Sequence, residues 1–276
     1  MAIATTEASL LRLLQLSSVS LPVGGYAFSQ GMEYAVDHGW IRNKTDVFDW
    51  LNTQLQQSLA RVDLPLLRFC MAAAKASNTT KLIELNDLLL ACRETKELRL
   101  TDTAMGQALL SLMGRLFGQL PEQLLGQAKG EEVSDSISYS MSNSSFSASS
   151  HSLSNLSSVN TLLEQKALEQ KILEQQEEVS FVTVFAVAAT RWHIDLHSAA
   201  LGFTWSWLEN QVAAATKLVP LGQTQAQELL GELQVSITDA IHFSHTLTED
   251  EVGAGLPALA IASALHETQY SRLFRS

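Results

Sequence analysis

Hydrophobic residues recur along this chain at intervals of three and four, which is the spacing of one face of an α-helix. The pattern is clearest at residues 47–62, 82–92, 98–117 and 229–241. The alternation of apolar and polar residues that indicates a half-buried strand is nearly absent, as are hairpin dipeptides. The sequence therefore predicts an all-α fold, a single multi-helix bundle domain of roughly eight to ten helices.

Three places depart from this simple pattern. Residues 181–188 are apolar nearly all round, which predicts a fully buried helix, with a buried strand as the alternative. Pro65 is expected to kink or break the helix before it, because proline has no N–H to donate. After a break at residues 220–223, one long helix is expected through Ile241, and a last helix over residues 258–268.

The middle of the chain has a different composition. From Ser134 to Ser158, 14 of 25 residues are serine. Such a stretch cannot bury enough apolar surface to offset the entropy lost on ordering. We therefore predict a disordered Ser-rich insertion at residues 130–160, within one domain that spans residues 1–276.

The composition restricts the classes of partner and compartment. The net charge of −11 disfavours binding to nucleic acid, because an acidic surface repels phosphate backbones. Cys70 and Cys92 form no CxxC pair and lie in apolar helical stretches, so we expect reduced core residues and a cytoplasmic protein. The longest apolar stretch, residues 181–190, is about half a membrane span, so no membrane association is expected.

Motifs for catalysis and nucleotide binding are missing from the sequence. It contains no GxGxxG, GxxxxGK[ST], HExxH or GxSxG pattern. The acidic residues are scattered over helical stretches, where solvation is their ordinary role. We therefore predict no catalytic residues and no tightly bound cofactor.

Histidines are the only candidates for metal ligands, and the candidates are weak. His193 and His197 are four apart with Asp195 between them, so both rings could face one ion from a helix. A site with two histidines is incomplete, because structural zinc takes four ligands. The candidates are His193, His197, His242, His245 and His266. For His266, beside Glu267, a hydrogen-bonded structural role is the preferred interpretation.

The densest local signal lies at residues 20–33, SLPVGGYAFSQGME. Its proline and glycines interrupt helix, and its two aromatic residues offer rigid apolar contacts. One interpretation is a tight connection between the first two helices. The other is a rigid recognition loop, with Gln30 and Glu33 at the start of the next helix.

Three segments in order carry a resemblance to a known family. They are Leu21-Pro22-Val23-Gly24 with Phe28-Ser29-Gln30-Gly31 and Glu33, then Pro220-Leu221-Gly222-Gln223 with Gln227, and finally the C-terminal run from His266 to Ser276. Together they resemble the signatures of UreF, the urease accessory protein family. The Ser-rich insertion has no counterpart in that pattern.

The resemblance implies an all-α homodimer that does no covalent chemistry. UreF-like proteins join a UreD (also called UreH) subunit and the GTPase UreG on apo-urease. The complex helps to load nickel into urease, and UreF modulates GTP hydrolysis by UreG, so transient contact with nickel is possible. The alternative function is a metal-dependent helical enzyme that uses His193 and His197 with Asp195.

The C-terminal tail is the main predicted partner surface. Tyr270, Leu273 and Phe274 are expected to fill pockets on UreD, while Arg272 and Arg275 make charge-assisted bonds. The alternative is that the tail folds back on its own core. The full set of predicted partner-binding residues is Gly24, Phe28, Gln30, Glu33, Gln223, His266, Glu267, Tyr270, Arg272, Leu273, Phe274 and Arg275.

Overall fold

The computed structural model describes residues 6–118 and 178–275. The predicted insertion at residues 130–160 lies outside these ranges. Met1–Leu110 and Glu177–Ser276 form one compact unit, and a second unit covers Ser111–Gln176. The first unit is described below, and the single domain over residues 1–276 stays a prediction.

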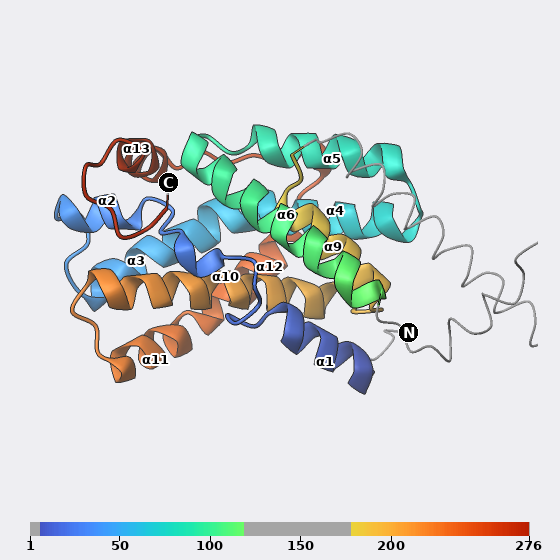
Figure 1. Cartoon of the computed structure of the whole chain (residues 1–276), viewed down its shortest axis with the longest axis horizontal. Coiled ribbons are helices and arrows are strands. Elements are labelled where there is room, and N and C mark those ends of the chain that lie inside the picture. The colour runs from blue at the N-terminus through green and yellow to red at the C-terminus, as the bar shows by residue number, and fades with distance from the viewer. Residues whose placement is uncertain (1–5, 119–177, 276) are drawn as a thin grey trace, which may run out of the picture. The chain divides into compact units, whose positions relative to one another are not determined.

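The described residues confirm the all-α prediction (Figure 1). They contain no strand, and an isolated β-bridge joins Phe28 to Arg275. The helices are α1 (Glu7–Leu16), the 3₁₀ helix η1 (Gly25–Ala27), α2 (Met32–Asp37), α3 (Lys44–Gln54), the π-helix η2 (Leu55–Asp63), α4 (Leu64–Lys75), α5 (Thr79–Ala91), α6 (Lys96–Gly118), α9 (Phe181–Arg191), α10 (Leu196–Leu218), α11 (Gln223–Glu232), α12 (Gln234–Ser244), the 3₁₀ helix η3 (Glu249–Glu251) and α13 (Pro257–His266).

The prediction that Pro65 breaks its helix is wrong. The chain stays helical from residue 44 to residue 75, and the winding changes to a π-helix before the proline. The N–H of Leu64 bonds to Leu59 O, five residues back, and Pro65 has no N–H to continue the ladder. The proline therefore coincides with a change of helix type, and the chain does not leave the helical conformation there.

The helix over residues 181–188 is fully buried, as predicted. Every side chain from Phe181 to Ala189 in α9 is buried, and α9 packs against α4, α5 and α10. Its ring pairs with Phe203 of α10 form the aromatic centre of the core, with centroids 5.3 Å apart for Phe185 and Phe203. The N-cap of α9 is Ser180, whose hydroxyl accepts a hydrogen bond from Val182 N.

The single long helix expected after residue 223 is two helices. α11 ends at Glu232 and α12 begins at Gln234, and Leu233 between them is completely buried. α11 packs against α10 and α3, whereas α12 packs against α10 and η2. The two helices thus have different neighbours, and the buried Leu233 is the turn residue between them.

The final helix, α13, lies beside α2 near the start of the chain. α13 packs against α2, and Figure 1 shows the C-terminal end beside α2 and α13. No helix in residues 6–118 or 178–275 is long and apolar enough to cross a membrane.

Candidate functional site: the junction of the N-terminal loop and the C-terminal tail

The loop at residues 21–33 and the tail at residues 267–275 lie against each other. The N–H of Arg275 donates to Ala27 O at 2.8 Å, and this contact belongs to the bridge between Phe28 and Arg275. The first and last segments of the predicted signature set therefore meet in space. We call this contact region, with His266 and Glu97 included, the junction.

Glu33 is the anchor of the tail. Its side chain is buried, and its two oxygens accept the N–H groups of Leu273 at 2.6 Å and Phe274 at 2.9 Å. Hydrogen bonds to a charged acceptor are about twice as strong as those between neutral groups. One carboxylate on α2 thus accepts hydrogen bonds from two backbone N–H groups of the tail, which would otherwise lack acceptors.

His266 lies between two carboxylates and is completely buried. Its Nε2 is 3.0 Å from Glu33 Oε2, and its Nδ1 is 3.2 Å from Glu97 Oε1. The second contact is poorly aligned for a hydrogen bond, and it becomes an ion pair when the ring is protonated. Burial lowers the pKa of His266, but the hydrogen bonds and charges of Glu97 and Glu33 outweigh it, so the pKa is raised above its ordinary value.

Glu97 is the part of the junction that the sequence did not reveal. It is completely buried at the start of α6, where it accepts Gly31 N at 3.2 Å and Ser263 Oγ at 3.0 Å. Its own N–H donates to Glu267 Oε1 at 2.9 Å. Glu97 lies in KELR, which is typical of an exposed helix start, so no local signal marked it as buried.

Gly31 allows α2 and α13 to approach each other. Its φ is +78°, and a Cβ atom there would lie 2.8 Å from the backbone N of Ser263. Any side chain would meet both backbone strain and a backbone clash. The glycine of the FSQG segment therefore has a packing role, because it lets the start of α2 approach the backbone of α13.

The tail divides into one buried and several exposed side chains. Phe274 is buried, and Lys217 Nζ of α10 lies 5.3 Å from the centre of its ring. Tyr270 is fully exposed, and 64% of Leu273 is exposed. Arg272 donates to Glu267 O at 3.1 Å, and Arg275 is exposed. The tail thus folds back on its own chain through Phe274, while its other large side chains face outward.

The remaining predicted contact residues have varied positions. Gln30, at a φ of +50°, accepts a hydrogen bond from Trp207 Nε1 at 3.1 Å. Gly24 is in the left-handed conformation that begins η1, and Phe28 is buried. Gln223 is the exposed first residue of α11, on a different helix from the junction. The structure therefore brings together the loop and tail residues but leaves Gln223 outside their contacts.

Comparison with known proteins decides the family. The UreF family model matches residues 41–234. A urease accessory protein UreF from Marinomonas sp. (strain MWYL1) is 58% identical over 274 residues, which covers 99% of this chain and 97% of that protein. Urease accessory proteins UreF from Alkalilimnicola ehrlichii and Teredinibacter turnerae are each 40% identical, over 265 and 267 residues, covering 96% and 97% of this chain and 95% and 98% of those proteins.

The chain belongs to the UreF family. This confirms the resemblance drawn from the three segments. It also decides that the chain is not an enzyme, since the family is one of accessory proteins. The family model stops short of both the loop and the tail, whereas the full-length UreF relatives cover them.

The histidines of this UreF-family chain do not assemble a metal centre in the part of the chain that the structure describes. No group of three His, Cys, Asp or Glu side chains there could hold an ion. Asp195, expected as a third ligand beside His193 and His197, instead caps α10 by accepting Ser198 N at 2.9 Å. The enzyme alternative therefore lacks both its ligand set and its family.

Histidines from two helices do approach each other. Burial lowers the pKa of His245, and the charges of Arg68, His197 and His242 lower it further. The start of α10 therefore lies near the end of α12, which places His197 near His242 and His245. All three side chains are exposed, and they belong to no three-ligand group.

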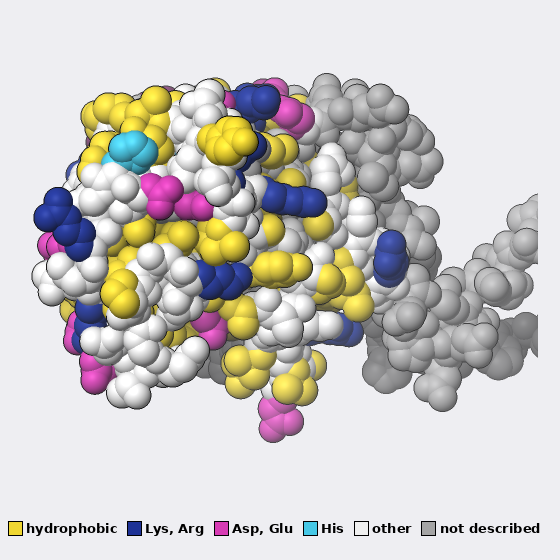
Figure 2. Space-filling model, turned by 60° about the vertical axis from the view of Figure 1, so that its left-hand side comes forward, with side chains coloured by type: hydrophobic (Ala, Val, Ile, Leu, Met, Phe, Trp, Pro, Cys, Tyr) yellow, Lys and Arg dark blue, Asp and Glu magenta, His cyan; other side chains and the backbone are white. Residues whose placement is uncertain are grey.

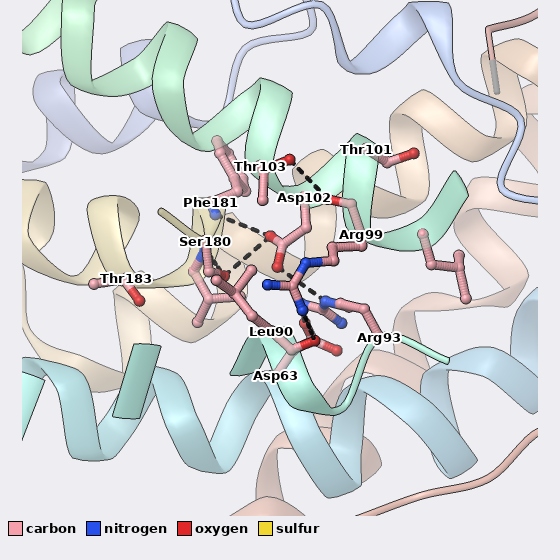
Figure 3. A network of polar contacts seen from close by, with 12 residues as sticks. Asp63, Leu90, Arg93, Arg99, Thr101, Asp102, Thr103, Ser180, Phe181 and Thr183 are labelled. Atoms are coloured by element: carbon pink, nitrogen blue, oxygen red, sulfur yellow. Dashed lines mark hydrogen bonds and ion pairs between the residues drawn. The ribbon is translucent and has the colours of Figure 1, made fainter. Parts of the chain in front are cut away.

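A second polar centre lies in the core of the same compact unit. Arg93 lies between Asp63 at the end of η2, 2.7 Å away, and Asp102 of α6, 2.9 Å away (Figure 3). Asp102 also accepts Ser180 Oγ and Phe181 N at the start of α9. The arginine satisfies both carboxylates, and this network joins η2, α6 and α9.

This network borders a cavity of about 100 Å³, lined also by Gln54, Gln211 and Trp207. Burial lowers the pKa of Arg93, but the charges of Asp102 and Asp63 outweigh it and raise the pKa above its ordinary value. The guanidinium therefore stays charged, and the network holds the π-helix against the helices that follow.

Proposed function

We propose that this chain is a scaffold and chaperone for the insertion of nickel into apo-urease. In this proposal it bridges a UreD/UreH-like subunit and a UreG-like GTPase and modulates hydrolysis of GTP by the latter. The support is its membership of the UreF family, whose members carry the name urease accessory protein. Nickel is then the cargo of the assembly and contacts this chain only transiently.

The observation that carries the proposal is the exposure of the tail on a rigid base. Glu33, His266 and Glu97 are buried and hold the backbone, while Tyr270 and Leu273 face outward. Aromatic and arginine side chains at such positions are the residue types that most often dominate the energy of an interface. We assign this surface to the UreD/UreH-like subunit.

The surface of α13 and of the loop also exposes large apolar side chains. Ile261 and Leu265, four apart on α13, are 50% and 42% exposed, and Tyr26 of the loop is 58% exposed. Figure 2 shows hydrophobic side chains gathered on this face, with separate Lys and Arg side chains between them. Large exposed apolar side chains on one face are typical of a protein contact. The loop side, with Gly24 and Gln30, is our proposed contact for UreG.

The test uses exposed side chains, so that stability is not disturbed. We expect Leu273→Asp, alone and with Tyr270→Ala, to lower co-purification with the UreD/UreH-like subunit at least about tenfold, the loss typical of an interface hot spot. The matched control is Leu11→Asp, an equally exposed leucine on α1. Unchanged capture by the tail variants, at an unchanged melting temperature, would contradict the assignment.

Two further parts of the proposal, the homodimer and the effect on GTP hydrolysis, need their own measurements. We propose a homodimer, which light scattering of the purified chain would test. GTP hydrolysis by UreG with and without this chain tests the proposed modulation. Cys70 and Cys92 are both free thiols, which supports the cytoplasm as the compartment.

A further inference from the structure

Glu33, His266 and Glu97 form a buried cluster, and Glu33 also holds the backbone of the tail. We propose that this carboxylate–histidine cluster is a pH-sensitive switch, in which protonated His266 holds residues 269–275 on the loop and loss of its proton releases them. The inference concerns regulation of the proposed partner surface, and only its biological consequence rests on the proposed function.

The geometry of the ring favours a charged histidine. Both ring nitrogens of His266 face carboxylate oxygens, at 3.0 Å for Glu33 and 3.2 Å for Glu97. An ionised carboxylate offers only acceptors, and a neutral imidazole has a single N–H. Only the imidazolium can face both partners with an N–H, so deprotonation leaves one nitrogen lone pair directed at a buried carboxylate.

The charges around the cluster are unbalanced without the proton. From the elements packed around His266, the facing or neighbouring groups are Glu33 and Asp37 of α2, Glu97 of α6, Glu267 after α13, Lys217 of α10, and Arg272 and Arg275 of the tail. Lys217 lies over Phe274, and Arg272 and Arg275 have exposed side chains. The protonated His266 ring places a cation directly against the two buried carboxylates, at 3.0 Å from Glu33 and 3.2 Å from Glu97.

The direction of the effect follows from the raised pKa of His266. A histidine whose folded-state pKa exceeds its unfolded value stabilises the folded form fully below about 6.5. That stabilisation is lost as the pH rises through the higher folded-state pKa. We therefore expect the tail to be docked below about pH 6.5 and released as the pH rises through the raised pKa of His266.

The tail is the part of the cluster that can leave. Glu97 is held by Gly31 and Ser263, which lie in the packed contact of α2 with α13. Glu33 instead holds the N–H groups of Leu273 and Phe274, in a terminal segment with one buried side chain. If the tail moves away, water reaches Glu33 and only one buried side chain becomes exposed. Separation of α2 from α13 would expose more buried surface.

Release would change the partner surface. Docking fixes Tyr270 and Leu273 relative to the loop, and release would separate them from Ala27 and Phe28. A partner that recognises the docked arrangement would bind less tightly as the pH rises, because the competent state would be a smaller fraction of the population.

A fluorine probe on the isolated full-length chain tests the switch. A trifluoromethyl label on Leu273→Cys, in a Cys92→Ser background, reports the tail by ¹⁹F NMR between about pH 5.5 and about pH 9.5, the range around the histidine pKa. Cys70 is buried and should stay unlabelled. We expect a docked signal at low pH and a second, sharper signal from the free tail that grows with a midpoint above about 6.5.

Two variants connect the transition to the cluster. His266→Gln should abolish the pH dependence, and Glu97→Gln should move the midpoint down by about one pH unit or more, because one stabilising charge is lost. His245→Gln, at the exposed residue that caps the end of α12, is the matched control and should leave the midpoint unchanged. Far-UV circular dichroism of each variant confirms that the fold is retained.

The outcomes separate this inference from the proposed function. An unchanged ¹⁹F spectrum across the pH range, or a transition that survives in His266→Gln, would overturn the switch. If His266→Gln does not fold, an unshifted midpoint in Glu97→Gln overturns it instead. Co-purification with the UreD/UreH-like subunit at fixed pH tests the proposed function, so either idea can fail while the other stands.

Discussion

The Nε2 atom of His266 lies 3.0 Å from Oε2 of Glu33, although 233 residues separate them along the chain. This pair joins the last helix to α2, and through Glu33 it reaches the backbone of the tail. Two ends of the sequence that look like independent signatures are therefore parts of one structure.

Loss of the Glu33 charge should release the tail and weaken the fold. In Glu33→Gln, the N–H groups of Leu273 and Phe274 lose a charged acceptor, and His266 keeps only one carboxylate. We expect unfolding free energy in urea to fall by about 2 kcal/mol, the scale of one or two charge-assisted hydrogen bonds.

The matched control for this substitution is Asp37→Asn, an exposed carboxylate on the same helix that accepts from Gln269. Its effect should stay within about 0.5 kcal/mol. Equal effects of the two substitutions would show that Glu33 is no stronger an anchor than a surface group.

Gly31 and Gly24 allow backbone strain to be separated from close packing. Both have a φ of +78°, but a Cβ atom at Gly31 would lie 2.8 Å from Ser263 N, whereas nothing lies within 4 Å of one at Gly24. We expect Gly24→Ala to cost about 1 kcal/mol and Gly31→Ala about 3 kcal/mol, measured by urea unfolding. Similar losses at both positions would argue against the close approach of α2 and α13.

Removal of Arg93 should be among the most damaging single changes. Arg93→Met leaves Asp63 and Asp102 buried without their cation, and we expect a loss of about 3–5 kcal/mol in thermal or urea unfolding. Arg99→Met, which breaks the exposed pair with Glu178, should cost less than about 1 kcal/mol. A mild effect at Arg93 would mean that water or nearby groups replace its charge.

The thiol of Cys70 should be unreactive in the folded protein. Burial raises the pKa of its thiol to about 12, so at pH 8 only about one in ten thousand molecules would carry the thiolate. In a Cys92→Ser background, we expect no reaction with Ellman's reagent until urea unfolds the chain. Rapid labelling of the native protein would show that α4 opens locally.

Much of the fold could be predicted from the spacing of apolar residues. The buried helix α9 and the helices over residues 82–92 and 98–117 follow from local patterns, since each has a face that must be covered. The break between α11 and α12 at Leu233 could not be predicted, and neither could the π-helix before Pro65. Both depend on which surfaces the neighbouring helices offer, and a local pattern contains no information on that.

The sequence by itself determined the helical class and the family, because these depend on local composition and short motifs, and it drew attention to the loop and the tail. Only the tertiary structure decided which of their side chains are exposed and which are buried. Phe28, Glu33, His266 and Phe274 are buried, while Tyr270 and Leu273 are exposed. Glu97 joined the site only because folding placed its charge beside His266, and a charge's partner is set by distance in space rather than along the chain.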